Sequence, residues 1–166
     1  MKRMLFIAAC AALTPMAALA HDGLKIDDPY ARVTGAKATS GAAFMNIENH
    51  KSVACTLSGV STDVAERAEL HTSTTDANGV TKMVKIENGI EIPANGAHPL
   101  TRGGDHLMLM GLKKPLADGD KFAVSFDFGE CGKLDAEIPV DSARKPDAGA
   151  AGGEKVDHQM HMPAAQ

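Results

Sequence analysis

Positive charge is scarce in this chain. The 166 residues include 17 Lys and Arg against 21 Asp and Glu, which gives a net charge of −4 with neutral histidines. Nucleic acids and anionic membranes both attract clustered basic side chains. The composition therefore argues against either of them as a partner.

Long apolar runs are also missing, apart from one at the N-terminus. Residues 1–20, MKRMLFIAACAALTPMAALA, place two basic residues before an Ala-rich run that ends in the A-x-A sequence Ala18-Leu19-Ala20. This pattern is typical of a cleaved secretory signal peptide, and the run is too short and too rich in Ala to span a membrane. The alternative is a lipoprotein signal that ends at Cys10. We expect a periplasmic protein whose mature chain starts at His21 and, without two of its basic residues, carries a net charge near −6.

Cysteine is rare, and the motifs of common enzyme classes are absent. Two cysteines follow the signal, Cys55 and Cys131, and neither lies in a C-x-x-C motif or beside a histidine. In an exported protein such a pair predicts one disulfide; two buried thiols or two thiolate metal ligands are the alternatives. The sequence contains no G-x-S-x-G, no H-E-x-x-H and no phosphate-binding loop. We therefore expect no enzymatic activity.

Short apolar or alternating runs do recur through the middle of the chain, separated by Gly, Asn, Asp and Pro. Turn-forming pairs such as Asn78-Gly79 and Asp118-Gly119 lie between them. The candidate strands are LKIDDPYARV, AAFMNIEN, CTLSGV, RAELHTS, VTKMVKI, GAHPLT, HLMLMGL, KFAVSFDF and LDAEIPV. Only residues 61–70, STDVAERAEL, compete as a short helix. Eight or nine short strands in about 120 residues predict an all-β domain over residues 21–142, built as a β-sandwich or a Greek-key barrel.

The composition changes at residue 143. Residues 143–166 are rich in Ala, Gly, Pro and charge and show no apolar periodicity, which predicts a flexible, disordered C-terminal tail. The end of this tail nevertheless holds two histidines and two methionines, namely His158, Met160, His161 and Met162.

Histidine and methionine are concentrated in the exported part, which contains all seven His and six of the nine Met. Side chains alternate between the faces of a strand. In the run HLMLM, His106, Met108 and Met110 therefore share one face, while Leu107 and Leu109 share the other. The Leu face suits a hydrophobic core. The opposite face suits a soft metal ion, although Met also fills cores well and a single His beside it is commonly structural.

A second His and Met lie upstream. His71 ends one candidate strand, Met83 lies in the next, and Asn78-Gly79 between them predicts a hairpin that brings the two residues together. With His106 and Met108 they form a set of two imidazoles and two thioethers. Such a set suits Cu(I) far better than Zn(II), Mg(II) or Ca(II). Because it lacks a thiolate, we expect it to release Cu(I) to a thiolate-bearing acceptor, as a carrier must.

Four stretches, GAAFMNIENH, VAERAELH, MVKIENGIEIPANG and HLMLMGLKKPLADGD, resemble the periplasmic PCuAC family of copper chaperones, and the similarity covers about residues 25 to 140. In that family a cupredoxin-like β-barrel binds Cu(I) through the motif H-(M)-x10-M-x21-H-x-M. The resemblance implies that the ligands are His71, Met83, His106 and Met108. The optional Met is Thr72 here, and 22 residues separate Met83 from His106, one more than in the motif.

The resemblance also implies a role and partners. Proteins of this family carry copper for assembly of the copper centres of cytochrome oxidase, so we expect the copper-centre subunit of the oxidase and Sco-type thiol assembly proteins as partners. A periplasmic copper-sequestering or homeostasis protein without a dedicated oxidase target is the alternative. We expect a monomer.

The tail repeats the pattern of the predicted metal strand. Asp105-His106-Leu107-Met108 returns as Asp157-His158-Gln159-Met160, followed by His161-Met162. The resemblance implies that His/Met-rich tails bind Cu(II) as well, so we expect copper on the tail, either as a second site or as a lid on the first; the alternative is a solvated tail whose His and Met are incidental. The α-amine and imidazole of a mature N-terminal His21 can also chelate Cu(II), although small or polar residues of any kind commonly follow a cleaved signal peptide.

Two other classes of protein fit the sequence less well. An electron-transfer cupredoxin needs two His and one Cys around the copper, with a weak axial ligand. Here no histidine follows Cys131 until His158. A structural β-sandwich module would explain the strands but not the clustering of His and Met.

Overall fold

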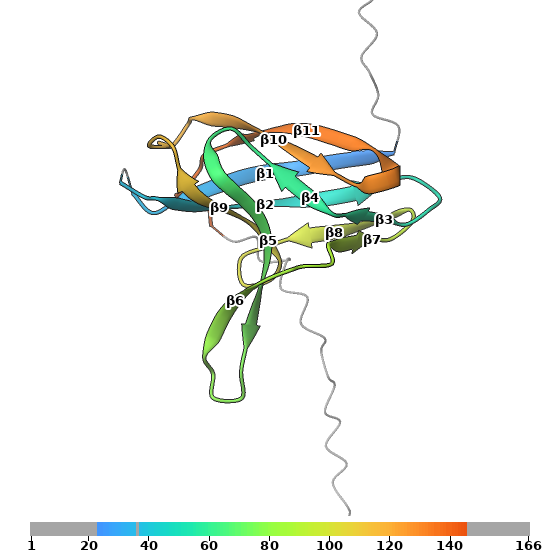
Figure 1. The fold of residues 1–166 in the computed structure, drawn as a ribbon, viewed down its shortest axis with the longest axis horizontal. Coiled ribbons are helices and arrows are strands. Elements are labelled where there is room, and N and C mark those ends of the chain that lie inside the picture. Colours follow the sequence, from blue (N-terminus) through green and yellow to red (C-terminus); the bar gives the residue numbers. More distant parts are fainter. Residues whose placement is uncertain (1–22, 36, 146–166) are drawn as a thin grey trace, which may run out of the picture.

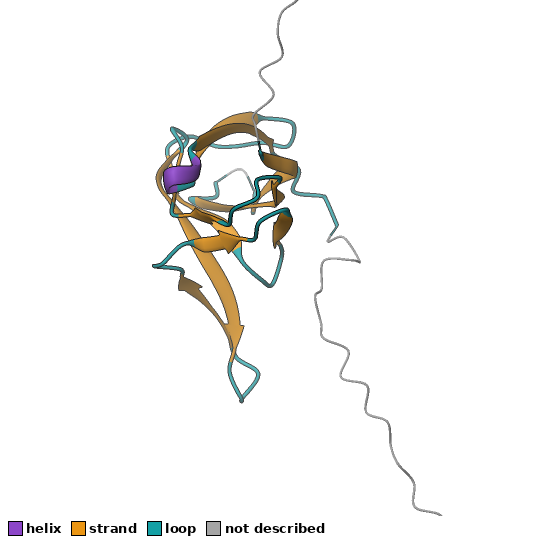
Figure 2. Cartoon of the chain, turned by 90° about the vertical axis from the view of Figure 1, so that its right-hand side faces the viewer, coloured by secondary structure: helices purple, strands orange, loops and turns teal. Residues whose placement is uncertain are grey.

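The computed structural model describes residues 23–35 and 37–145, where all regular structure is β-strand except one 3₁₀ turn (Figure 2). The strands are β1 (Leu24–Val33), β2 (Ser40–Asn49), β3 (Cys55–Leu57), β4 (Gly59–Ser61), β5 (Ala65–Thr75), β6 (Thr81–Lys85), β7 (Ile90–Ile92), β8 (Gly96–Leu100), β9 (His106–Leu112), β10 (Lys121–Asp127) and β11 (Lys133–Pro139). The 3₁₀ turn η1 spans Gly129–Cys131. The predicted all-β fold is confirmed. In the described part of the chain, no helix has the length and apolar character needed to cross a membrane.

The largest sheet has six strands in the order β1-β2-β9-β5-β6, with β8 also paired to β2. β2 has two partners on one side because residues 40–43 pair with β9 and residues 45–49 pair with β8. A three-stranded sheet, β11-β10-β4, and a two-stranded sheet, β3-β7, complete the domain. A parallel bridge between Ala31 and Val140 joins the edge of the large sheet to the end of β11, so the sheets lie around one core (Figure 1).

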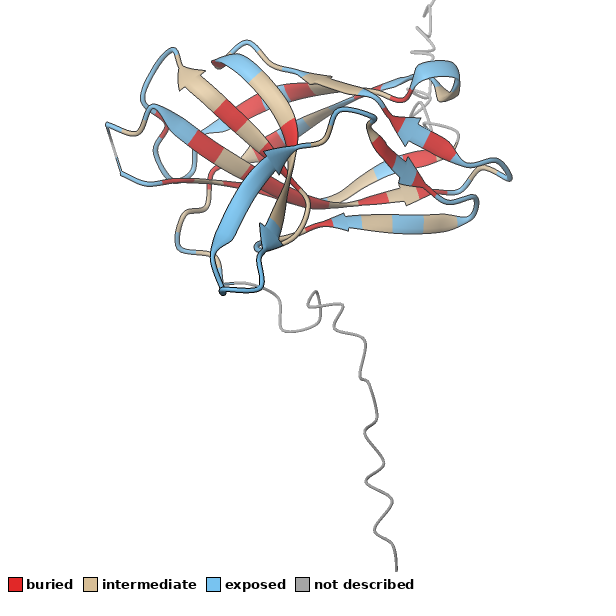
Figure 3. Cartoon of the chain, turned by 60° about the horizontal axis from the view of Figure 1, so that its bottom comes forward, coloured by how far each residue is buried: buried red, intermediate tan, exposed pale blue. Residues whose placement is uncertain are grey.

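Alternation along the strands determines which side chains fill this core. Leu107 and Leu109 on β9 are fully buried, as are Val124 and Phe126 on β10. The residues between them are more exposed, which Figure 3 shows as alternating bands. Burial of each large apolar side chain contributes about 1.5–3 kcal/mol. A shift of one residue would turn these side chains outward, so the core fixes the register and thereby the outward face of β9.

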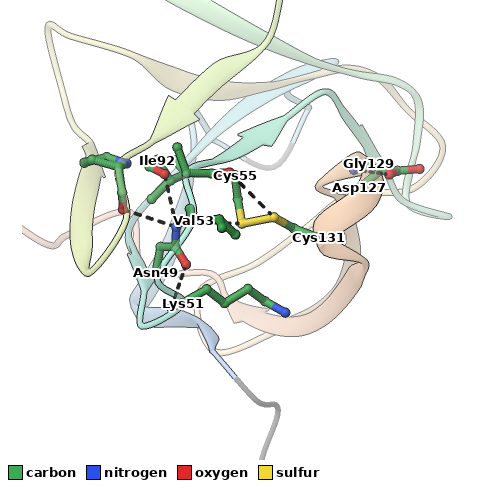
Figure 4. The surroundings of a disulfide bond; sticks show 10 residues. Asn49, Lys51, Val53, Cys55, Ile92, Asp127, Gly129 and Cys131 are labelled. Carbon is green, nitrogen blue, oxygen red and sulfur yellow. Dashed lines mark hydrogen bonds between the residues drawn. A yellow bond between two sulfur atoms is a disulfide. The ribbon is translucent and has the colours of Figure 1, made fainter.

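A disulfide joins Cys55, at the start of β3, to Cys131 in η1 (Figure 4). The predicted disulfide is confirmed, and the two alternatives, buried thiols and thiolate metal ligands, are excluded for this pair. The bonded residues lie 76 positions apart in the sequence. Closing a loop of that length restricts the unfolded chain, which stabilises the fold by roughly 4 kcal/mol.

A buried amide lies beside the disulfide. The side-chain nitrogen of Asn49 donates hydrogen bonds to the carbonyl oxygens of Val53, at 2.8 Å, and Ile92, at 3.2 Å (Figure 4). Its oxygen accepts from the backbone N–H of Lys51 at 3.0 Å. Because Asn49 is fully buried and satisfied on both atoms, it ties the end of β2 to the segment before Cys55 and to β7.

The structure differs from the sequence-based assignment at three places. CTLSGV does not form one strand, because Cys55 pairs with Ile92 on β7 while Val60 pairs with Phe126 on β10. β7 itself was not among the predicted strands. The last part of the segment that competed as a helix belongs to β5, where pairing with β9 outweighs local helix propensity.

One hairpin extends beyond the body of the domain. The far part of β5 and all of β6 project away from the other strands (Figures 1 and 3), and every residue of β6 is exposed. Val80, Met83 and Val84 are among the most exposed large apolar residues in the described chain. This projecting hairpin carries one of the predicted copper ligands.

Candidate metal site

Two of the predicted ligands lie directly opposite each other on neighbouring strands. His106 on β9 pairs with His71 on β5, and their ring centres are 6.1 Å apart. Metal–imidazole bonds are about 2.0 Å long, so two rings that share one ion have centres about 5–6 Å apart. The observed spacing of the two imidazoles is therefore close to that needed to hold a common ion.

The environment of His106 leaves one of its ring nitrogens free for a ligand. Its side chain is 3% exposed, and Nδ1 lies 2.9 Å from the carbonyl oxygen of Gly104. Since a carbonyl only accepts, Nδ1 carries the proton and Nε2 keeps a lone pair. Nε2 is buried and has no hydrogen-bond partner among the described residues. An unsatisfied buried polar atom costs about 1–3 kcal/mol, and a bound metal ion would relieve this cost.

His71 is held by a carboxylate. Its Nε2 lies 3.1 Å from Oε2 of Glu69, two residues earlier on the same face of β5, and both side chains are largely buried. The hydrogen bond from His71 lowers the pKa of Glu69, and the positive charges of Lys85 and Arg67 add to the effect. Glu69 is therefore an ionised acceptor beside the imidazole of His71.

The two methionines border the same open hollow. Met108 lies opposite Ala42 on β2 and Glu69 on β5. Met83 pairs with Ser73, two residues after His71, which places it on the same face of the sheet as His71. Both thioethers line a hollow of about 330 Å³, and Met83 is 62% exposed.

Small residues of β2 make room for this hollow. Ser40, Gly41 and Ala42 form part of its lining beside Met108. A Cβ atom on Gly41 would lie 3.0 Å from Val33 Cγ1 and 3.1 Å from the carbonyl oxygen of Arg32, so a larger residue would push β1 and β2 apart.

Aromatic and charged residues form the far side of the site. The ring of Phe44 is 6.3 Å from His106 and 5.2 Å from Tyr30, and the Arg144 guanidinium lies 4.3 Å above the Tyr30 ring. Ser142 lines the hollow and accepts a hydrogen bond from Nη2 of Arg32 at 2.7 Å. The C-terminal end of the described chain therefore runs along the edge of the site.

The described residues contain no group of three or more His, Cys, Asp or Glu side chains that could hold a metal ion. A metal bound at the set identified above would need its thioether sulfurs. The remaining predicted ligands, His158, Met160, His161 and Met162, lie outside the described residues, as does His21.

Sequence reasoning missed Gly104 and Glu69, which hold the two imidazoles. Glu69 could have been found, because its separation of two residues from His71 on a strand places both on one face. The contact between Gly104 and His106 depends on the loop before β9, for which the sequence gives no comparable signal.

Comparisons with known proteins support this description. The model of the family "Putative lipoprotein LpqE-like" matches residues 24–140. The putative lipoprotein Lxx21020 of Leifsonia xyli subsp. xyli is 33% identical over 119 residues, which cover 72% of this chain and 70% of that protein. The solution structure of CuI-DR1885 from Deinococcus radiodurans matches with a TM-score of 0.56 and 30% identity, covering 74% of this chain and 82% of that one. The copper-bound PCuAC domain from PmoF2, at 18% identity and a TM-score of 0.59 over 72% and 93% of the two chains, shares the fold.

Proposed function

Since this chain belongs to the LpqE-like family, a family of the PCuAC type, we propose that it is an exported copper chaperone that carries Cu(I) on four residues. These are His71, Met83, His106 and Met108. The observation that carries the proposal is the buried Nε2 atom of His106, which has no hydrogen-bond partner within the described residues. Its ring lies beside a second imidazole and on the same face of the sheet as the two thioethers.

The donor set determines the preferred metal. Thioether sulfur is soft and uncharged, and imidazole binds copper in both oxidation states, so the set favours Cu(I) over harder divalent ions. Solved structures of relatives support this choice, since one holds Cu(I) and another is copper-bound. Cys55 and Cys131 are bonded to each other, so the described residues supply no thiolate to the site. Cu(I) held in this way is readily passed to an acceptor that offers thiolates, and the chain needs no catalytic activity.

The proposed destination is the copper-centre subunit of cytochrome oxidase, reached together with Sco-type thiol assembly proteins. The exposed position of Met83 on the projecting hairpin supports delivery, because an acceptor can approach that ligand from solvent. Transfer of Cu(I) from the loaded chain to a purified dithiol acceptor would separate the two roles. A carrier gives up its copper, whereas a sequestering protein keeps it.

The family and the Leifsonia relative are named as putative lipoproteins, which supports export. We further propose cleavage after Ala20 and residence in the periplasm. Mass spectrometry of the mature protein would decide between an N-terminus at His21 and a lipidated Cys10.

The tail is proposed to bind Cu(II) through His158, Met160, His161 and Met162. The described chain passes the hollow at Ser142, so the tail starts near the barrel site. Deletion of residues 155–166 should lower the number of Cu(II) ions bound while leaving Cu(I) binding intact. Unchanged Cu(II) stoichiometry would refute tail binding.

Anaerobic titration of the mature chain with Cu(I), in competition with a chromophoric chelator, tests the proposed four-residue Cu(I) site. We expect one tight site, weakened in His106→Ala and Met108→Ala by at least the roughly 10–100-fold that loss of an outer hydrogen-bond partner costs at metal sites. His50→Ala is the matched control, because the His50 side chain is 64% exposed and follows the end of β2 that is remote from the residues paired with β9. If the site variants bind Cu(I) as tightly as the parent, the assignment is wrong.

A further inference from the structure

The two imidazoles of the site are held through different nitrogens. In His106, Nδ1 donates to the carbonyl oxygen of Gly104, which leaves Nε2 as the free nitrogen. In His71, Nε2 lies 3.1 Å from the Glu69 carboxylate, which can only accept, so Nε2 donates and Nδ1 is left. The structure therefore presents opposite nitrogens of the two rings for metal binding.

The contact with Glu69 is built into the sheet. Glu69 and His71 are two residues apart on β5, and the exposed fractions of their side chains are 21% and 14%. Glu69 lies opposite Met108 on β9, and His71 lies opposite Lys85 on β6. The carboxylate is thus flanked by two of the proposed ligands rather than pointing into solvent.

We infer that Glu69 is a positioning residue: it holds Nε2–H of His71 so that this imidazole offers Nδ1 to Cu(I), while His106 offers Nε2. The inference rests on the proposed function. A carboxylate that accepts from the outer N–H of a metal-bound imidazole fixes the tautomer and the ring orientation and makes the ring a better donor.

The chemistry of the carboxylate argues for this outer role. Carboxylate oxygen is a hard donor that suits Mg, Ca or Mn, whereas Cu(I) prefers the thioethers already present. Glu69 lies beside the proposed site, so its negative charge favours the binding of a positive ion there. Removing Glu69 would take away both the hydrogen bond that orients the His71 ring and this favourable charge.

The test is ¹⁵N NMR of the histidine rings in the mature chain, with and without Cu(I). In the metal-free parent at pH 8, His71 should carry its proton on Nε2 and His106 on Nδ1. Added Cu(I) should shift Nδ1 of His71 and Nε2 of His106. A Cu(I)-induced shift at Nε2 of His71 would overturn the inference, and this measurement needs no variant.

The Cu(I) affinities of Glu69 variants provide a second test. Glu69→Ala should lose the fixed tautomer of His71 and bind Cu(I) roughly 10–100-fold more weakly. Glu69→Gln keeps an oxygen that accepts from Nε2–H, so it should lose less than about tenfold. An unchanged Cu(I) affinity in Glu69→Ala would refute the positioning role.

The chain offers a matched control. Glu48 and His50 on and after β2 form the same contact, with His50 Nε2 3.2 Å from Glu48 Oε2, but lie away from the proposed ligands. Glu48→Ala should leave Cu(I) affinity unchanged. A parent chain that binds no Cu(I) would refute the proposed function and this inference with it, whereas a parent that binds normally beside an unaffected Glu69→Ala would refute the inference alone.

Discussion

The imidazole of His98 lies 2.9 Å, at Nε2, from Oδ2 of Asp105, the residue immediately before His106. The backbone N–H of Thr101 also donates to the carbonyl oxygen of Asp105 at 2.7 Å. These two contacts close the loop that carries Gly104, whose carbonyl oxygen holds Nδ1 of His106. The orientation of His106 thus depends on a pair of side chains that do not themselves touch the proposed metal position.

Breaking this pair should loosen the site without removing a ligand. We expect Asp105→Ala to weaken Cu(I) binding up to about tenfold, the lower end of what outer partners contribute at metal sites. The Nδ1–H resonance of His106 should broaden or shift in the same variant, because the Gly104 carbonyl is less well fixed. Competition with a Cu(I) chelator measures the affinity, and NMR of the same sample measures the Nδ1–H resonance of His106. A sharp, unshifted Nδ1–H signal would show that the loop does not depend on this pair.

The disulfide should matter for stability and not for copper. Replacing both Cys55 and Cys131 by Ala removes a constraint on the unfolded chain, and we expect the free energy of unfolding to fall by roughly 4 kcal/mol. Cu(I) stoichiometry should stay the same, since neither sulfur belongs to the proposed ligand set. Urea unfolding and copper titration of the variant measure the two quantities separately. A lost equivalent of Cu(I) in a folded variant would contradict the proposed donors.

Acid should weaken one link at the C-terminal end of the domain. The Arg144 guanidinium donates from Nη1 to Oδ1 of Asp28 at 2.9 Å, and this pairing lowers the pKa of Asp28 below its ordinary value. A carboxyl with a lowered folded-state pKa contributes stability above its unfolded pKa, about 3.9, and loses it as the pH falls through the folded value. Because Asp28 is largely exposed, the contribution should be less than about 1 kcal/mol.

Asp28→Asn tests this pH dependence. Asp28 has a φ of 49°, and Asn tolerates that backbone region as well as Asp does, so the substitution removes charge with little strain. The variant should be less stable than the parent in urea at pH 7, and the difference should shrink as the pH falls through the lowered pKa of Asp28. A stability difference that stays constant as the pH is lowered would assign the effect to something other than the ion pair.

Much of the fold could be predicted because burial imposes a period of two. The bounds of β1 and β9 agree with the sequence-based strands, since turn residues precede and follow each of them. No sequence pattern indicated the irregularity within β1, where the register with β2 shifts between Asp27 and Tyr30. β7 escaped prediction because it has only three residues, Ile90–Ile92, between an Asn-Gly turn and a proline. Its place beside β3 depends on a long-range pairing that local pattern does not encode.

The site divides in the same way. Alternation predicted that His106 and Met108 share a face, and the hairpin turn predicted that His71 and Met83 lie close together. Grouping the two pairs was a hypothesis, and the structure places His71 directly opposite His106. The roles of Gly104 and Glu69 could be recognised only in the three-dimensional structure. Each role depends on the position of one oxygen atom, the carbonyl oxygen of Gly104 or Oε2 of Glu69. Assignment of the four ligands remains a proposal that the copper experiments decide.

The two methionines should contribute unequally to Cu(I) binding. Met108 lies within the six-stranded sheet between β2 and β5, whereas Met83 is 62% exposed on the outermost strand of the projecting hairpin. Leu is similar in volume to Met, so Met→Leu removes the sulfur with little change in packing. We expect Met108→Leu to weaken Cu(I) binding by roughly 100-fold and Met83→Leu by roughly tenfold, which correspond to about 2.7 and 1.4 kcal/mol.

The rate of copper release should distinguish the two positions further. Met83 is exposed, so a thiol acceptor can replace this ligand from solvent. Met83→Leu leaves that coordination position open to the thiol, and the transfer of Cu(I) to dithiothreitol in stopped-flow measurements should therefore be faster. Met110→Leu is the control, because Met110 shares the face of β9 but lies against Nη2 of Arg67 at 3.9 Å, outside the proposed set. Equal losses of Cu(I) affinity in Met83→Leu and Met108→Leu would mean that the hairpin is held as firmly as the sheet. An unchanged Cu(I) affinity in Met83→Leu would show that Met83 is not a ligand.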